Sequence, residues 1–171
     1  NPDRLWQSIM DIAEIGPTPE GGSCRLALTA EDAAARSLFL RWCQAVGLHH
    51  EQDAIGNMFL RRTGVDAAVP AVAFGSHLDT VPTGGRFDGI AGVLAGLEVI
   101  RALDDAGVRT LASLELVNWT NEEGSRFRPA MMGSRVAAGE LPLDVALATT
   151  DDDGVSVAQA LTDSGQAGAL T

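Results

Sequence analysis

The sequence predicts an α/β fold, a three-layer α/β/α arrangement around a mixed, mainly parallel sheet. The first observation is an apolar run at 70–74, which has the length of a buried strand and leads into a loop at 75–89 that is rich in glycine and proline. The second is a helical pattern at 90–106, followed by another apolar strand at 111–119. Strand, loop, helix and strand in this order make a βαβ unit, in which the two strands are parallel.

Two helices are predicted before this unit, and the first lies at the beginning of the sequence. Asn1 can cap it with Pro2 at the first helical position. Apolar residues recur at near-helical spacing until about Ile15, where the Gly16–Pro19 segment stops the helix.

The second helix is marked by signals at both ends. The segment from Thr29 to Asp32 resembles a capping box with Asp in place of the usual Glu or Gln. The helix behind it should run to about Val46, because Gly47 is suited to a left-handed cap.

A polar segment and a further strand connect this helix to the βαβ unit. His49 and His50 have no ligand-like neighbours, so we interpret them as ordinary surface histidines. The pattern at 54–62 predicts a strand, and 64–66 predicts a turn. We therefore expect an antiparallel hairpin between 54–62 and the strand at 70–75.

The last third of the sequence has weaker patterns. Short helices are predicted at 131–138 and 155–161, whereas 141–149 is ambiguous between helix and extended structure. Asp151–Asp153 lacks the alternating spacing of a calcium-binding loop, so we interpret it as a solvated acidic turn.

Composition limits the classes of partner. The 171 residues suffice for one α/β domain, and the net charge of −11 makes nucleic acid and anionic membranes poor partners. No apolar run is long enough to span a membrane, and the first residues do not resemble a signal peptide. Cys24 and Cys43 show no motif spacing, so we expect reduced thiols in a cytoplasmic protein.

Acidic and imidazole side chains follow the two predicted parallel strands. His77, Asp79 and Asp88 lie after the first strand, and Glu122 and Glu123 lie after the second. In open α/β sheets, sites form beyond the carboxyl ends of the strands. One histidine and several carboxylates meeting there indicate a metal site, which we favour over a solvated acidic surface.

The residue types also suggest roles. His77 can bind a metal, the Asp79 carboxylate can accept the other ring N–H, and Asp88 can bridge two ions. Of Glu122 and Glu123, one should bind metal while the other acts as general base toward a metal-bound water. Such an arrangement hydrolyses amide bonds.

Three segments resemble the di-metal amidohydrolases of the hydantoinase/carbamoylase group, namely 75–81, 84–89 and 118–124. Supporting segments are 53–57 and 126–131. That group contains N-carbamoyl-L-amino-acid hydrolases, β-ureidopropionases and allantoate amidohydrolases, and it is related to the co-catalytic zinc aminoacylases and carboxypeptidases.

The resemblance implies a role for each candidate residue. His77 is implied as a ligand of one metal, Asp88 as the bridge and Glu123 as a ligand of the other metal. Glu122 is implied as the general base and Asp79 as the support of His77. The cofactors implied are two divalent ions, zinc or manganese, with cobalt and nickel as alternatives.

The resemblance also implies how the sequence fits into a larger protein. Residues 1–171 correspond to the N-terminal portion of a catalytic metal-binding domain, incomplete at its C-terminal side, and the lid or dimerisation domain is absent. We expect these residues not to be active alone, and the full-length protein to be a homodimer. The expected reaction is hydrolysis of a linear amide or ureido C–N bond in a small molecule, an N-carbamoyl-L-amino acid or allantoate. The alternatives are a related aminoacylase or metallopeptidase and a non-catalytic remnant.

Overall fold

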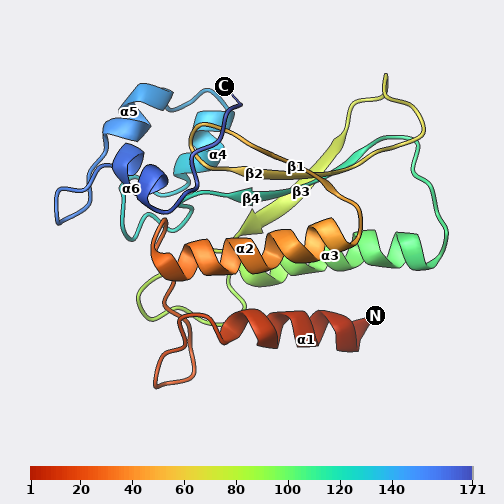
Figure 1. Ribbon diagram of the computed structural model, residues 1–171, viewed down its shortest axis with the longest axis horizontal. Coiled ribbons are helices and arrows are strands. Elements are labelled where there is room, and N and C mark those ends of the chain that lie inside the picture. The colour runs from red at the N-terminus through yellow and green to blue at the C-terminus, as the bar shows by residue number, and fades with distance from the viewer. Residues whose placement is uncertain (171) are drawn as a thin grey trace.

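The computed structural model describes residues 1–170, which form six helices and four strands (Figure 1). The helices are α1 (Pro2–Ala13), α2 (Ala30–Ala45), α3 (Ile90–Asp105), α4 (Met132–Ala137), α5 (Leu143–Ala148) and α6 (Val157–Asp163). The strands are β1 (His49–Gln52), β2 (Met58–Arg62), β3 (Val72–His77) and β4 (Leu114–Trp119). The predicted helices are confirmed, and the ambiguous segment at 141–149 contains α5.

The helix caps form largely as predicted. The Asn1 side chain accepts hydrogen bonds from the backbone of Asp3 and Arg4, and the Thr29 hydroxyl accepts one from the Asp32 N–H. The Asp32 carboxylate does not complete the capping box, because it accepts from the Leu28 N–H instead. Caps of this kind fix where each helix begins, since they satisfy N–H groups that have no partner within the helix.

The four strands form one mixed sheet in the order β1-β2-β4-β3. Only β3 and β4 are parallel, whereas β1–β2 and β2–β4 are antiparallel. The expectation of a mainly parallel sheet is therefore wrong for residues 1–170, although the βαβ unit of β3, α3 and β4 is confirmed.

The predicted hairpin between β2 and β3 is also wrong. After β2, the backbone N–H groups of Val65 and Asp66 donate to the carbonyls of Thr110 and Leu111, which precede β4. The chain after β2 therefore runs beside the approach to β4, and β4 lies between β2 and β3.

The segment predicted to be only polar and exposed forms an edge strand. His49 and His50 belong to β1, which pairs with β2. His49 is exposed, whereas His50 is half-buried and its pKa is lowered, mainly by burial. Strand formation here depends on pairing with β2, which the local sequence does not encode.

One face of the sheet carries the main core. Side chains from β2 and β4 pack there against α2 and α3, while α1 contacts α3 on the side away from the sheet (Figure 1). The buried residues at its centre include Phe39, Leu60, Leu97 and Leu116. On the opposite face, Phe59, Ala73 and Trp119 are half-buried or exposed. Residues 1–170 thus supply the sheet and one helical side of the expected three-layer arrangement.

Small residues let α3 approach the sheet closely. A Cβ atom at Gly96 would lie 2.6 Å from Leu116 Cδ1, and one at Gly92 would lie 2.8 Å from Ser76 Cβ. The glycines lower helix propensity, but they bring the beginning of α3 close to the end of β3, where the candidate site lies.

The three short helices α4, α5 and α6 gather at the end of the sheet where β4 finishes (Figure 1). They enclose a second apolar cluster that includes Ile55, Phe127, Met132 and Leu161. Cys24 and Cys43 are free thiols, as expected. Within residues 1–170, no helix combines the length and apolar character needed to span a bilayer.

Candidate metal centre

The site begins where the two parallel strands end side by side. In their register, His77 at the end of β3 lies opposite Trp119 at the end of β4. The loops that follow carry Asp79 on one side and Glu122 with Glu123 on the other. His77, Asp79, Glu122 and Glu123 therefore lie at the same end of the sheet.

His77 is buried and its ring has a defined orientation. Ring Nδ1 lies 2.9 Å from the backbone carbonyl oxygen of Asp79, and because a carbonyl only accepts, Nδ1 must carry the proton. The other nitrogen, Nε2, lies 3.3 Å from a carboxylate oxygen of Glu122. In the neutral ring, Nε2 is therefore the nitrogen available to bind a metal.

The Asp79 carboxylate has a different role from the predicted one. Its Oδ1 lies 3.7 Å from His77 Nδ1, beyond a hydrogen bond, so the expected support of the ring comes from the Asp79 backbone. The carboxylate instead accepts the backbone N–H groups of Glu122 and Glu123, each at 3.2 Å. Asp79 therefore ties the loop after β3 to the loop after β4.

The environment of Asp79 is unusual for a carboxylate. The residue is 1% exposed, and burial, reinforced by the negative charge of Asp32, raises its pKa to about 6. The hydrogen bonds from Glu122 and Glu123 act in the opposite direction, because they favour the charged form.

Glu123 is half-buried at the rim of the same site. Burial raises the pKa of Glu123, the nearby imidazole of His77 lowers it, and the negative charges of Asp88 and Glu122 raise it further. His77, Asp88 and Glu122 therefore lie within electrostatic range of Glu123. Grouped carboxylates of this kind repel each other unless a cation is shared among them.

Asp88 is exposed and lies just before α3. The next residue, Gly89, has φ +69°, and a Cβ there would lie 2.5 Å from His77 Cε1. The Gly89 backbone thus packs against the histidine ring, and Asp88 directly precedes it in the chain.

The residue types fit a divalent metal, because imidazole and carboxylate suit zinc and manganese. Among residues 1–170, however, no three His, Cys, Asp or Glu side chains come together closely enough to hold an ion. The contacts present are those of His77 with Glu122 and with Asp79, while Asp88 and Glu123 approach within electrostatic range.

Asn57 also supports the loop after β4, although no role was predicted for it. Its side chain accepts the Thr120 N–H at 2.9 Å and donates to Asp53 at 2.7 Å and to the Gly133 carbonyl at 3.0 Å. It therefore joins the start of β2 to the loop that carries the glutamates. The only signal in the sequence was its place in the 53–57 segment of the family resemblance.

The family model described as peptidase family M20/M25/M40 matches residues 73–163, more than half of the chain. The chain therefore belongs to this family, and membership implies metal dependence.

More similar proteins define a narrower group. A hydantoinase/carbamoylase family amidase from Burkholderia ambifaria superposes with a TM-score of 0.98 at 55% identity, over 99% of this chain and 42% of that one. An N-carbamoyl-L-amino-acid amidohydrolase from Rhizobium meliloti is 50% identical over 91% of this chain and 38% of its own length. A ureidoglycolate hydrolase from Arabidopsis thaliana is 37% identical over 90% of this chain and 32% of its own length. Within the M20 family, the chain falls in the hydantoinase/carbamoylase group.

The chain spans about two fifths or less of the length of these three relatives. The comparisons therefore concern the part of each relative that corresponds to residues 1–171.

Proposed function

We propose that the full-length protein hydrolyses a linear amide or ureido C–N bond by means of a metal-activated water. The observation that carries this proposal is the meeting of His77 Nε2 with the Glu122 carboxylate at 3.3 Å, on loops that Asp79 ties together. The proposed substrates are N-carbamoyl-L-amino acids or allantoate, and the amidohydrolase from Rhizobium meliloti supports the former.

Each residue of the site has a proposed task. His77, Asp88 and Glu123 would hold two divalent cations, zinc or manganese with cobalt and nickel as alternatives, which supply an acidified water and polarise the carbonyl. Glu122 takes the proton of the attacking water and delivers it to the leaving nitrogen. Asp79 holds the ring of His77 through its carbonyl and the backbone of both glutamates through its carboxylate.

Ureidoglycolate is a second candidate substrate. The plant ureidoglycolate hydrolase at 37% identity favours it, and ureidoglycolate also contains ureido C–N bonds. A peptidase function has weaker support, because an aminopeptidase from Bacillus cereus is only 20% identical and indicates the fold alone.

The remaining properties of the whole protein are also proposals. We propose a cytoplasmic homodimer that acts on small molecules rather than on nucleic acid or membranes. The free thiols of Cys24 and Cys43 and the net charge of −11 support the location and the choice of substrate. Because no three potential ligands come together within residues 1–170, we propose that residues 1–171 are inactive in isolation.

A substrate panel tests the reaction class. The full-length protein loaded with Zn²⁺ or Mn²⁺ is assayed on N-carbamoyl-L-amino acids, allantoate, ureidoglycolate and dipeptides. We expect the highest kcat/KM for a carbamoyl or ureido compound. A preference for dipeptides would replace this proposal with a peptidase, and turnover of none of them would favour a non-catalytic remnant.

A further inference from the structure

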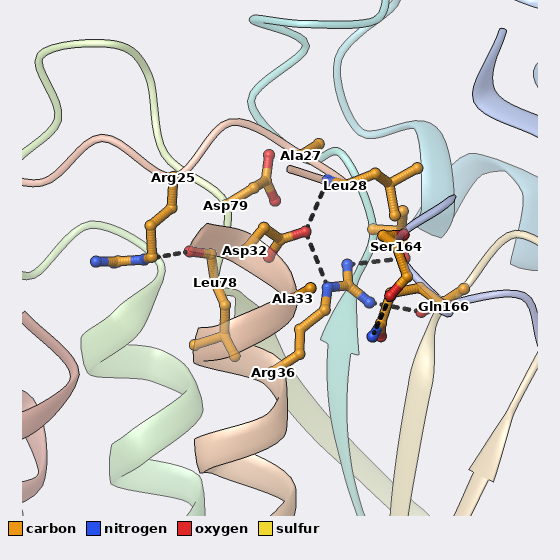
Figure 2. A network of polar contacts seen from close by, with 12 residues as sticks. Arg25, Ala27, Leu28, Asp32, Ala33, Arg36, Leu78, Asp79, Ser164 and Gln166 are labelled. Atoms are coloured by element: carbon orange, nitrogen blue, oxygen red, sulfur yellow. Dashed lines mark hydrogen bonds and ion pairs between the residues drawn. The ribbon is translucent and has the colours of Figure 1, made fainter. Parts of the chain in front are cut away.

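A buried ion pair lies on α2, and its carboxylate, Asp32, is within electrostatic range of Asp79 (Figure 2). Asp32 and Arg36 are 0% and 1% exposed, and Arg36 Nε lies 3.0 Å from Asp32 Oδ2. The same carboxylate oxygen accepts the Leu28 N–H at 2.8 Å. Two fully buried charges in one helix are costly to desolvate, and their directed hydrogen bonds are what offsets this cost.

Arg36 connects three separate segments through its three nitrogens. Besides Asp32 on α2, it donates from Nη1 to the Gly56 carbonyl at 2.8 Å and from Nη2 to the Thr120 hydroxyl at 3.1 Å. The guanidinium is planar and rigid, so these directed contacts fix the positions of the three segments relative to one another.

Thr120 is the first residue of the loop that carries Glu122 and Glu123. It follows β4 directly and comes two residues before Glu122. Its N–H donates to Asn57 at 2.9 Å, and its carbonyl accepts the Gly133 N–H at 2.9 Å, so Arg36 provides the contact that fixes its side chain. Asp79 holds the far end of the same loop through the backbone of Glu122 and Glu123.

We propose that Arg36, oriented by Asp32, is a positioning residue that sets where the Thr120–Glu123 loop presents its carboxylates to His77. This inference rests on the proposed function, because it gives the network a task in metal binding and proton transfer. Arg36 contacts neither substrate nor metal in this scheme and acts on the glutamates through Thr120.

The sharpest test changes Thr120 rather than Arg36. Removing Arg36 leaves the Asp32 charge buried without its partner, which is expected to unfold the protein. Thr120→Val keeps the shape and removes the hydroxyl that Arg36 contacts, whereas Thr120→Ser keeps the hydroxyl and removes the methyl group. A role in packing predicts the greater effect for Ser, and a role in positioning predicts the greater effect for Val.

The first measurement is kcat and KM of the full-length, metal-loaded protein, expressed per folded site. We expect Thr120→Val to lower kcat by about 10- to 100-fold, the range typical for partners of metal-site residues, and Thr120→Ser to stay within about 2-fold of wild type. A Thr120→Val protein with wild-type kcat, or a Thr120→Ser protein with the larger loss, would overturn the proposal.

The second measurement does not depend on turnover. Zn²⁺ titration of the full-length apoprotein should give a Kd about 10-fold weaker for Thr120→Val than for wild type or Thr120→Ser. Glu98→Gln serves as a control, because it removes the charge of a buried acid in the middle of α3. This variant should lower Tm without changing the Kd for Zn²⁺. Equal Zn²⁺ affinities for Thr120→Val and wild type would refute the positioning role. If wild type hydrolyses nothing in the panel, the proposed function fails, and the titration still decides the role of Arg36.

Discussion

Single residues decide how the side chains of the candidate site are oriented. Gly89 is the strongest example, because its backbone with φ +69° packs directly against the His77 ring. Only glycine adopts this conformation at low cost, and only the absence of a Cβ leaves room for the imidazole. The orientation of His77 thus depends on a residue that has no side chain to contribute.

The Gly89→Ala variant tests this dependence. The added methyl group meets His77 at 2.5 Å in a left-handed backbone, so we expect Tm to fall and the metal content of the full-length protein to decrease. The matched control is Gly85→Ala in the same loop, where an added Cβ meets no atom within 4 Å. Calorimetry and elemental analysis of both variants check the prediction, and equal effects of the two substitutions would contradict it.

The positions of the candidate residues at the ends of β3 and β4 were predictable from the sequence, whereas their contacts were not, and their roles stay predictions. His77 and Asp79 follow a recognisable strand, so their place at its carboxyl end could be derived. Whether the carboxylate or the carbonyl of Asp79 meets the imidazole depends on the loop after β4, which folds against it from 43 residues away. No local pattern encodes such a contact.

At the scale of elements, helices were easier to predict than strand order. Helix ends depend on local signals such as Asn1 and Thr29, which the structure uses as caps. Strand order depends on which of the possible partner strands each strand pairs with. The crossover through α3 places β4 beside β3, and β2 then pairs with the other edge of β4.

The contact between α1 and α3 depends on an ion pair that should respond to pH. Glu98 accepts hydrogen bonds from Arg4, the shortest of which is 2.8 Å long. The effect of this contact on the pKa of Glu98 is greater than the opposite effect of burial, so the pKa falls from 4.5 to about 2. A lowered pKa means that the stabilisation is fully present above pH 4.5 and is lost as the pH falls toward 2.

Glu98→Gln should therefore lower Tm at pH 7, and the difference from wild type should shrink as the pH falls from 4.5 to about 2. Calorimetry over this pH range measures the effect. Glu140→Gln serves as the control, because the Glu140 side chain is 69% exposed and lies 3.9 Å from its partner Arg135. A Tm difference for Glu98→Gln that is independent of pH would show that the charge of Glu98 does not stabilise the contact.

At the scale of the whole molecule, residues 1–170 form a sheet with helices on one face and the candidate site at its end. The opposite face carries the half-buried pair Phe59 and Trp119, whose ring centroids lie 6.1 Å apart. The family resemblance in the sequence predicted the group correctly, and these residues span about two fifths or less of the length of the relatives compared.

Metal removal separates a bound cofactor from an accidental ion. A chelator should abolish the activity of the full-length protein, and added Zn²⁺ or Mn²⁺ should restore it. The reason is that carboxylates alone cannot lower the pKa of the attacking water to near neutrality. Asp88→Ala should lower the metal content of the full-length protein as measured by elemental analysis. Full activity after exhaustive chelation would contradict a metal-dependent reaction.

The most direct test of the central claim is the turnover of full-length Glu122→Gln on its best substrate, measured together with metal content. Glu115→Gln on β4, whose side chain pairs with Arg61 away from the site, is the matched control. We predict that Glu122→Gln lowers kcat by about 10²- to 10⁴-fold at normal metal content, while Glu115→Gln keeps the wild-type rate. A metal-loaded Glu122→Gln protein that turns over at the wild-type rate would contradict the account.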